Sequence, residues 1–161
     1  MKQNRIAKLA SIVALAGIAT LGATSFVPVE ATTFTPAKLI YLVNGVVDNS
    51  SLSIGTSVPC TNQSRLTATV RWIFHDAGGV VKSSYATSIS AGQTVYVATL
   101  NGVAIYAEVQ VGGANYQGNV AIYSTQSEVF CSALVGPSSN TSVPGSLLHM
   151  IRFNEHPGVV E

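Results

Sequence analysis

The stretch Arg65–His75, RLTATVRWIFH, decides the fold class, because its apolar and polar residues alternate almost one by one. Alternation with a period of two is typical of a strand that buries one face and exposes the other. Its β-branched and aromatic residues are also types that strands favour. The predicted buried face consists of Leu66, Ala68, Val70, Trp72 and Phe74. The rest of the chain must therefore cover Trp72 and Phe74.

Short strand-like segments separated by turn residues lie on both sides of this stretch. Val80–Ile89 returns after the predicted turn Asp76–Gly79 and forms a hairpin with it. Asn44-Gly45 indicates either a tight hairpin or a bulged strand. Further strands are predicted at Lys38–Val47, Leu52–Ile54, Gln93–Leu100, Val103–Val111, Asn119–Ser124, Glu128–Val135 and Ser146–Asn154. This pattern predicts one all-β domain over residues 32–161, an antiparallel sandwich of about 7–9 strands.

The chain carries little charge, with charged residues making up 9% of its 161 residues. From residue 32 onward there are five basic and six acidic side chains, which gives a net charge of −1. No basic stripe is available to neutralise the phosphates of a nucleic acid, so a nucleic-acid partner is excluded. A hydrophobic share of 47% together with many Ser, Thr, Gly and Asn residues is typical of extracellular β-proteins.

Residues 1–31 are predicted to be a secretory signal peptide. Three basic residues precede Leu9–Val29, an uncharged run rich in small and apolar residues, and Val29-Glu30-Ala31 is a suitable cleavage site. The mature protein is then secreted to the periplasm or the extracellular space, without membrane contact. The alternative is an uncleaved membrane anchor, because the run is about as long as a spanning helix.

The two cysteines, Cys60 and Cys131, are predicted to form a disulfide, as is usual in an exported chain. Closing a loop of about 70 residues contributes roughly 4 kcal/mol in the chain-entropy model. The sulfur atoms are expected to bridge the two layers of the sandwich around Trp72. Metal ligation is disfavoured, because the thiols are far apart in sequence and have no CxxC spacing or nearby His.

Two resemblances support this fold. The order and spacing of Cys60, Trp72 and Cys131 resemble the Cys…Trp…Cys set of immunoglobulin-like or fibronectin-like sandwiches. Four segments also resemble a group of small secreted bacterial proteins: VRWIFHDAGGVV, GQTVYVATLNGVAIYAE, STQSEVFCSALV and LLHMIRFN. The resemblance implies export and an immunoglobulin-like β-sandwich, and it implies no particular activity.

Known catalytic motifs are absent from the sequence: GxSxG, HExxH, the P-loop and a strand-linked GxGxxG. Three weaker arrangements are His149 with Glu155 and His156 as metal ligands, His75-Asp76 as a base with its orienting carboxylate, and Glu108 with Glu128 as a hydrolase pair. Each has a simpler reading as solvated strand or turn residues. The chain is therefore expected to be non-catalytic and without a cofactor or metal.

Tyrosines provide the better lead to a function. Tyr96, Tyr106 and Tyr123 are out of phase with the apolar residues of their strands, and Tyr116 lies in the adjoining glycine-rich loop. They are predicted to form an exposed aromatic shelf beside three polar residues, Glu108, Gln110 and Gln117. Aromatic rings beside amides and carboxylates suit a polysaccharide. The alternative is that these rings only stabilise the sheet as cross-strand pairs.

The pattern as a whole favours a secreted, non-catalytic structural or interaction module, with carbohydrate binding through the tyrosine shelf as the alternative. The expected partner is an extracellular polysaccharide or another surface protein. Residues 146–154 carry apolar groups on both faces after a Pro/Ser/Gly-rich loop. This segment is predicted to be a strand of its own domain, or else a strand that joins a neighbouring copy.

Overall fold

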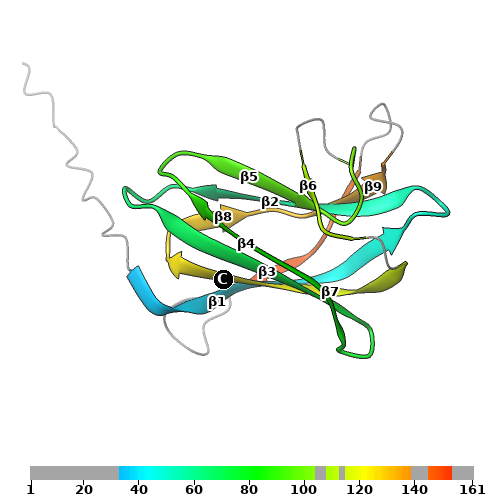
Figure 1. Ribbon diagram of the computed structural model, residues 1–161, viewed down its shortest axis with the longest axis horizontal. Coiled ribbons are helices and arrows are strands. Elements are labelled where there is room, and N and C mark those ends of the chain that lie inside the picture. Colours follow the sequence, from blue (N-terminus) through cyan, green and yellow to red (C-terminus); the bar gives the residue numbers. More distant parts are fainter. Residues whose placement is uncertain (1–32, 104–107, 113–114, 139–144, 154–161) are drawn as a thin grey trace, which may run out of the picture.

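The computed structural model describes residues 33–103, 108–112, 115–138 and 145–153, and the predicted signal peptide lies outside this range. All regular structure within these residues is β-strand (Figure 1). The strands in chain order are β1 (Thr33–Asn49), β2 (Ile54–Asn62), β3 (Ala68–Asp76), β4 (Val81–Ile89), β5 (Thr94–Ala98), β6 (Val109–Gln110), β7 (Tyr116–Gln126), β8 (Val129–Cys131), β9 (Leu134–Pro137), β10 (Ser146–Leu147) and β11 (Met150–Arg152).

One half of the sheet has the order β4-β3-β7-β1-β11, and all neighbours are antiparallel. The alternation predicted for β3 is confirmed, because its inward residues from Ala68 to Phe74 are fully buried. Leu66 is the exception: it precedes the strand and is 54% exposed. The predicted hairpin with β4 is also confirmed, and Trp72 pairs with Tyr85 with ring centroids 6.0 Å apart.

The other half is built on β2. Its antiparallel partners are β5 on one side and β8 followed by β9 on the other. The predicted strand Glu128–Val135 is thus interrupted, with Ser132 and Ala133 between β8 and β9. Beyond these neighbours, β10 pairs with β9, and β6 runs parallel to β5. Of the predicted strand Val103–Val111, the structure shows Val109–Gln110 as strand, and residues 104–107 lie outside the described part.

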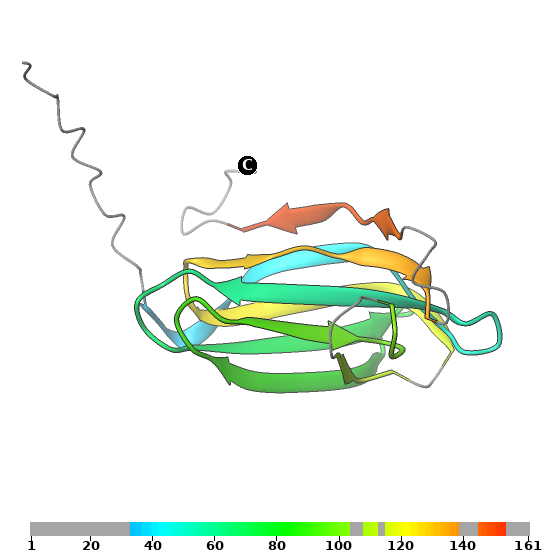
Figure 2. The ribbon, with the colours of Figure 1, turned by 90° about the horizontal axis from the view of Figure 1, so that it is seen from above.

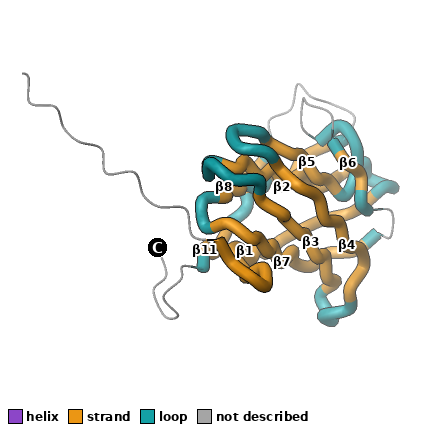
Figure 3. Tube along the Cα trace, turned by 60° about the vertical axis from the view of Figure 1, so that its left-hand side comes forward, coloured by secondary structure: helices purple, strands orange, loops and turns teal. Residues whose placement is uncertain are grey.

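The two halves enclose a common core (Figure 3). Fully buried side chains come from both: Trp72 and Ile122 from the first half, and Val58, Val97 and Val129 from the second. Because inward residues of both halves belong to one cluster, the continuous sheet must fold back on itself. For the described residues, the all-β prediction is confirmed, and so is the antiparallel pairing apart from the short parallel pair of β5 and β6.

Two connections join the halves along one border. The end of β1 pairs with the start of β2, through Asp48 with Gly55. The C-terminal segment then passes from one half to the other: Leu148 N donates to Ala133 O, and Phe153 N donates to Ile40 O (Figure 2). Its strand β11 pairs with β1 of the same chain.

The Asn44-Gly45 dipeptide, predicted to form a tight hairpin or a bulged strand, forms a bulge at Gly45. β1 continues through this dipeptide beside β7, with a register shift between Asn44 and Val46. Gly45 has a φ of 79°, a conformation that glycine adopts without steric cost. Of the two alternatives in the sequence, the bulged strand is therefore correct and the tight hairpin is wrong.

The predicted Cys60–Cys131 disulfide is present, but it does not bridge the two halves. Cys60 on β2 pairs directly with Cys131 on β8, and their Cα atoms are 4.1 Å apart. Ser132 N donates to Pro59 O, so the adjacent cysteine pair occupies a non-hydrogen-bonded position, where opposite residues approach most closely. The bond therefore joins neighbouring strands of one half, unlike the inter-sheet disulfide of immunoglobulin domains.

Candidate functional site

The predicted tyrosine shelf is not formed by the described residues. Tyr96 is opposite Pro59 and out of phase with the buried Val97, so it lies on the outer face of the β2 half. Tyr123 is opposite Arg71 and lies on the outer face of the other half. Because the core separates these faces, the two rings point away from each other. Tyr106 lies outside the described residues.

Tyr116 departs further from the prediction, because it faces inward. It belongs to the core cluster and is 8% exposed. Burial raises the pKa of its hydroxyl to about 12; the nearby Ser83 hydroxyl lowers this pKa in part, and the negative charge of Asp48 raises it. The Tyr116 ring therefore packs in the core and is not part of an exposed shelf.

The polar residues assigned to the shelf are also dispersed. Glu108 Oε2 accepts a hydrogen bond of 3.0 Å from Val103 N and so closes the loop before β6. Gln110 is exposed on β6, and Gln117 is exposed on β7. These side chains belong to different halves of the sheet.

Glu108 and Glu128 do not form a hydrolase pair. The position of each glutamate along β2 can be read from the strand pairing. Glu108 precedes Val109, which pairs with Val97, and Val97 pairs with Val58 of β2. Glu128 lies beside Gln63, because its carbonyl accepts a hydrogen bond from Gln63 N. Val58 and Gln63, the residue after β2, are five positions apart, which is roughly 16 Å at about 3.3 Å per residue. The strands beside the two glutamates, β6 and β8, also lie on opposite sides of β2, so the backbone does not bring Glu108 and Glu128 together.

The two remaining arrangements lie in the β3–β4 turn and in the C-terminal segment. Asp76 Oδ1 accepts hydrogen bonds from Gly78 N and Val80 N, so this carboxylate holds the β3–β4 turn. No group of three His, Cys, Asp or Glu residues in the described part is arranged to hold a metal ion. His149 is exposed, and its predicted partners Glu155 and His156 lie outside that part.

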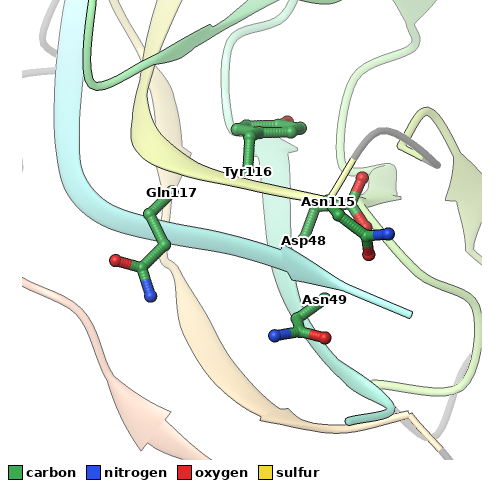
Figure 4. Close-up of a pocket in the computed structure, with 5 residues that line it drawn as sticks. All are labelled: Asp48, Asn49, Asn115, Tyr116 and Gln117. Carbon is green, nitrogen blue, oxygen red and sulfur yellow. The ribbon is translucent and has the colours of Figure 1, made fainter. Parts of the chain in front are cut away.

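A small polar pocket lies where β1 ends and β7 begins (Figure 4). Its volume is about 160 Å³, and its lining consists of Asp48, Asn49, Asn115, Tyr116 and Gln117. Asp48 and Tyr116 are directly opposite each other in the β1–β7 register. One carboxylate, three amides and one aromatic ring thus gather from two segments that are far apart in sequence.

Local turn chemistry positions the two asparagines of the pocket. Asn49 Oδ1 accepts a hydrogen bond of 3.0 Å from Leu52 N and organises the β1–β2 turn. Asn115 Oδ1 accepts hydrogen bonds from Ser50 N at 2.8 Å and Ser50 Oγ at 2.9 Å. Asn115 also has a φ of 46°, a region that Asn tolerates better than most residues. The turn and the start of β7 are thereby held together.

A buried polar network supports the floor of the pocket. Asp48 is 1% exposed, and the preceding residue Val47 is held through its backbone. The Val47 carbonyl accepts hydrogen bonds from the hydroxyls of Thr99 at 2.7 Å and Thr56 at 3.1 Å, and Val47 N donates to the Thr56 hydroxyl. A side chain at Gly112 would collide with the Asp48 carboxylate and the Thr99 carbonyl, so only glycine fits there.

Sequence reasoning missed this pocket, apart from Tyr116 and Gln117. Asp48-Asn49-Ser50-Ser51 carried a turn signal only, and Asn115 lay within a glycine-rich loop. The turn signal is locally correct, because residues 50–53 form a turn, and Asn115 lies between β6 and β7. Their approach depends on the β1–β7 pairing, which brings Asp48 to Tyr116 across 68 positions of sequence. Periodicity within a single segment carries no signal for such a contact.

Comparison with known proteins gives no assignment: no family model, curated protein or solved structure matches this chain. Within the described residues, no helix long and apolar enough to cross a membrane is found.

Proposed function

We propose that this protein is a secreted, non-catalytic interaction module of the cell surface or the extracellular space. The signal-peptide pattern of residues 1–31 supports secretion. The disulfide is consistent with an oxidising compartment such as the periplasm or the extracellular space. The core shared by the two halves supports a two-layered β-sandwich as the finer description of the fold.

The border strand β4 is the observation that carries this proposal. Among the described strands β4 pairs with β3 alone, so one side of its nine-residue backbone has no strand partner there. Backbone N–H and C=O groups along such a border can pair with a strand of another protein. Val80 and Val81 at its beginning are exposed apolar side chains. We therefore infer that β4 is where a surface protein binds.

Lysine positions make this proposal directly testable. Lys38 on β1 and Lys82 on β4 are the only lysines after residue 31, and both are exposed. The secreted protein is treated in culture with a short amine-reactive crosslinker, and the crosslinked peptides are identified by mass spectrometry. A partner seated on β4 gives crosslinks at Lys82 and not at Lys38.

The control variant is Lys82→Arg, which keeps the charge but removes the reactive amine. Its crosslinks at Lys82 disappear, while co-purification of the partner persists. Crosslinks confined to Lys38 would contradict the β4 assignment. A protein that gives no crosslinked partner but turns over a substrate would contradict the passive role as a whole.

Carbohydrate binding is a second candidate, and the pocket between β1 and β7 is the observation that favours it. Its lining includes three amides, and amides are hydrogen-bonding groups of the kind that a sugar needs. Electrophoresis in gels containing soluble polysaccharides tests this candidate, because binding slows migration. Trp72 is fully buried, so its fluorescence is a poor reporter of binding and the gel is the better measurement.

A further inference from the structure

We propose that Asn101 is a site of spontaneous covalent modification in the folded protein, at which the side-chain amide is lost and a carboxylate is formed. The sequence contains two Asn-Gly dipeptides, Asn44-Gly45 and Asn101-Gly102. Because glycine has no Cβ, the backbone nitrogen that follows each asparagine is unshielded. The two dipeptides therefore share the same intrinsic reactivity, and the fold decides which of them reacts.

The reaction needs water as its only co-reactant. The backbone nitrogen of Gly102 attacks Cγ of Asn101, so that an N–Cγ bond forms, and the Cγ–Nδ2 bond breaks. The attacking nitrogen loses its proton, and Nδ2 leaves as ammonia. Water then opens the cyclic imide. Hydrolysis at Cγ gives aspartate, whereas hydrolysis at the backbone carbonyl gives isoaspartate, in which the main chain is one methylene longer.

The two sites are closely matched in sequence and exposure. The segments Val43-Asn44-Gly45-Val46 and Leu100-Asn101-Gly102-Val103 differ only in the aliphatic residue before the asparagine. Both asparagines are exposed, and the glycines have similar positive φ angles, 79° at Gly45 and 81° at Gly102. A difference in rate between the sites must therefore come from the backbone structure around each of them.

The backbone around Asn44 opposes formation of the imide. Asn44 is opposite Asn119 of β7, and the residue after Gly45 is opposite Gly118. Closing the ring requires rotation about the Cα–C bond of Asn44, which brings the Gly45 nitrogen toward the asparagine Cβ. An extended strand holds this nitrogen on a different side of the bond. Asn44 can therefore react only after β1 and β7 separate locally, which lowers its rate.

Asn101 lies in a different backbone setting. It belongs to the turn after β5, and within the described residues neither Asn101 nor Gly102 takes part in strand pairing (Figure 1). The next residue closes this turn, since Val103 N donates to Glu108 Oε2 at 3.0 Å. Rotation about the Cα–C bond of Asn101 thus breaks no strand pairing. The imide can form there while the sheet stays closed.

An isoaspartate in this turn would disturb close contacts. A Cβ at Gly102 would collide with the Ser138 carbonyl, so the turn lies directly against the residue that follows β9. A Cβ at Gly55 would collide with Leu100 and Val103, so the same turn packs over β2. An additional methylene in the main chain does not fit within these contacts. The turn is expected to separate from β2, whereas a normal aspartate leaves the backbone unchanged.

The test follows the two asparagines in purified protein kept for weeks at 37 °C and mildly alkaline pH, once folded and once unfolded in guanidinium chloride. Peptide mapping by mass spectrometry measures the conversion of each. In the folded protein, Asn101 is expected to convert at least about tenfold faster than Asn44, because β1 must first open. In the unfolded protein, the two rates should be similar. If the folded protein keeps Asn101 intact, or converts Asn44 equally fast, the proposal is wrong.

Glutamine variants assign the change of charge, because glutamine would have to close a larger ring and reacts more slowly. Isoelectric focusing of aged, folded protein should show a main new acidic band in the wild type and in Asn44→Gln, but not in Asn101→Gln. Both substitutions are at exposed positions. A band that persists in Asn101→Gln and disappears in Asn44→Gln would overturn the assignment.

Asn101→Asp separates the added charge from the longer main chain. Amide hydrogen exchange of Val103 is compared by NMR in fresh wild type, aged wild type and this variant. Exchange should become faster in the aged protein and stay slow in the variant, because only isoaspartate lengthens the backbone. Equal acceleration in both would show that the charge loosens the turn and would contradict the role given to the additional methylene.

Discussion

Asn62 shows at the residue scale how a polar side chain can act as part of the core. It is fully buried, and its Nδ2 donates to the carbonyls of Leu66 and Ile89 at 2.7 and 2.8 Å. Its Oδ1 accepts hydrogen bonds from Ser64 N and Ser64 Oγ at 3.0 and 2.7 Å. Both amide hydrogens and the carbonyl oxygen are thus used, which ties the segment after β2 to the end of β4.

Replacing Asn62 by Ala should lower the free energy of unfolding by about 3 kcal/mol, because two buried carbonyls and Ser64 lose their partners. Urea denaturation at neutral pH measures the loss. Asn101→Ala, at an exposed turn position, is the control and should change stability by less than about 0.5 kcal/mol. Similar losses in the two variants would contradict the structural role of Asn62.

Tyr116 links stability to alkaline pH. Its folded-state pKa of about 12 exceeds the ordinary value of 10.0, so the unfolded chain loses this proton first as pH rises. The stabilisation is complete below pH 10 and is lost progressively between pH 10 and about 12. Tyr116→Phe should therefore reduce the loss of stability between pH 8 and pH 11, measured by urea midpoints.

The control for this pH effect is Tyr123→Phe on the outer face of β7, which removes one tyrosine hydroxyl outside the core. An unaltered slope in Tyr116→Phe would show that other groups cause the alkaline loss.

At the scale of elements, the short strand β11 is attached by a side chain in addition to its backbone pairing. β11 contributes three residues to its pairing with β1. Arg152 adds contacts to other elements: its guanidinium lies 4.5 Å from the centroid of the Phe130 ring and 5.7 Å from that of Tyr41, and Nη2 donates to Ser127 O at 3.2 Å. One side chain thus connects the C-terminal segment to β1, β8 and the β7–β8 turn.

Arg152→Ala should loosen this segment locally, at a cost of about 1–2 kcal/mol from the lost cation–π contacts and hydrogen bond. Amide hydrogen exchange of residues 150–153 is expected to become faster, while that of β3 stays protected. Arg71→Ala is the control, because Arg71 is exposed on β3 and bonds only to Ser84 among the described contacts. Faster exchange throughout the sheet in Arg152→Ala would argue against a local role.

The disulfide acts at the scale of the whole molecule. It joins positions 71 residues apart, although the strands that carry them are immediate neighbours. In the chain-entropy model, a crosslink over that length lowers the conformational entropy of the unfolded chain and so stabilises the folded state by roughly 4 kcal/mol. The benefit falls on the entire domain, because β3, β4, β5 and β7 all lie within the closed loop.

Replacing both Cys60 and Cys131 by Ala should lower the free energy of unfolding by about 2–5 kcal/mol and reduce Tm. Wild-type protein unfolded with a reducing agent present provides the comparison, since it loses the crosslink without a change of sequence. A double variant as stable as the oxidised wild type would show that the paired strands alone suffice.

Features that depend on neighbouring residues could be predicted from the sequence, whereas features that depend on contacts between distant segments could not. Alternation in Arg65–His75 was sufficient to predict β3 and its buried face, and Asp76–Gly79 was sufficient to predict the hairpin with β4. Leu66 broke the pattern, because the hydrogen bonds of Asn62 and Ser64 hold its backbone in a turn before the strand begins. For the predicted tyrosine shelf, the alternation of residues along each strand correctly placed Tyr96 and Tyr123 outside the core. It could not show that the two rings lie on opposite faces of the molecule.

What the sequence determined by itself is therefore local: some of the strands with their buried faces, β3 above all, the β3–β4 turn and the pairing of the only two cysteines. These follow from side-chain period, backbone preferences and composition, all of which act within a few residues. Which strands became neighbours was decided only in the tertiary structure, because strand pairing joins residues regardless of their separation along the chain. That pairing placed the disulfide within one half, separated the tyrosines, and brought Asp48 beside Tyr116 in the pocket.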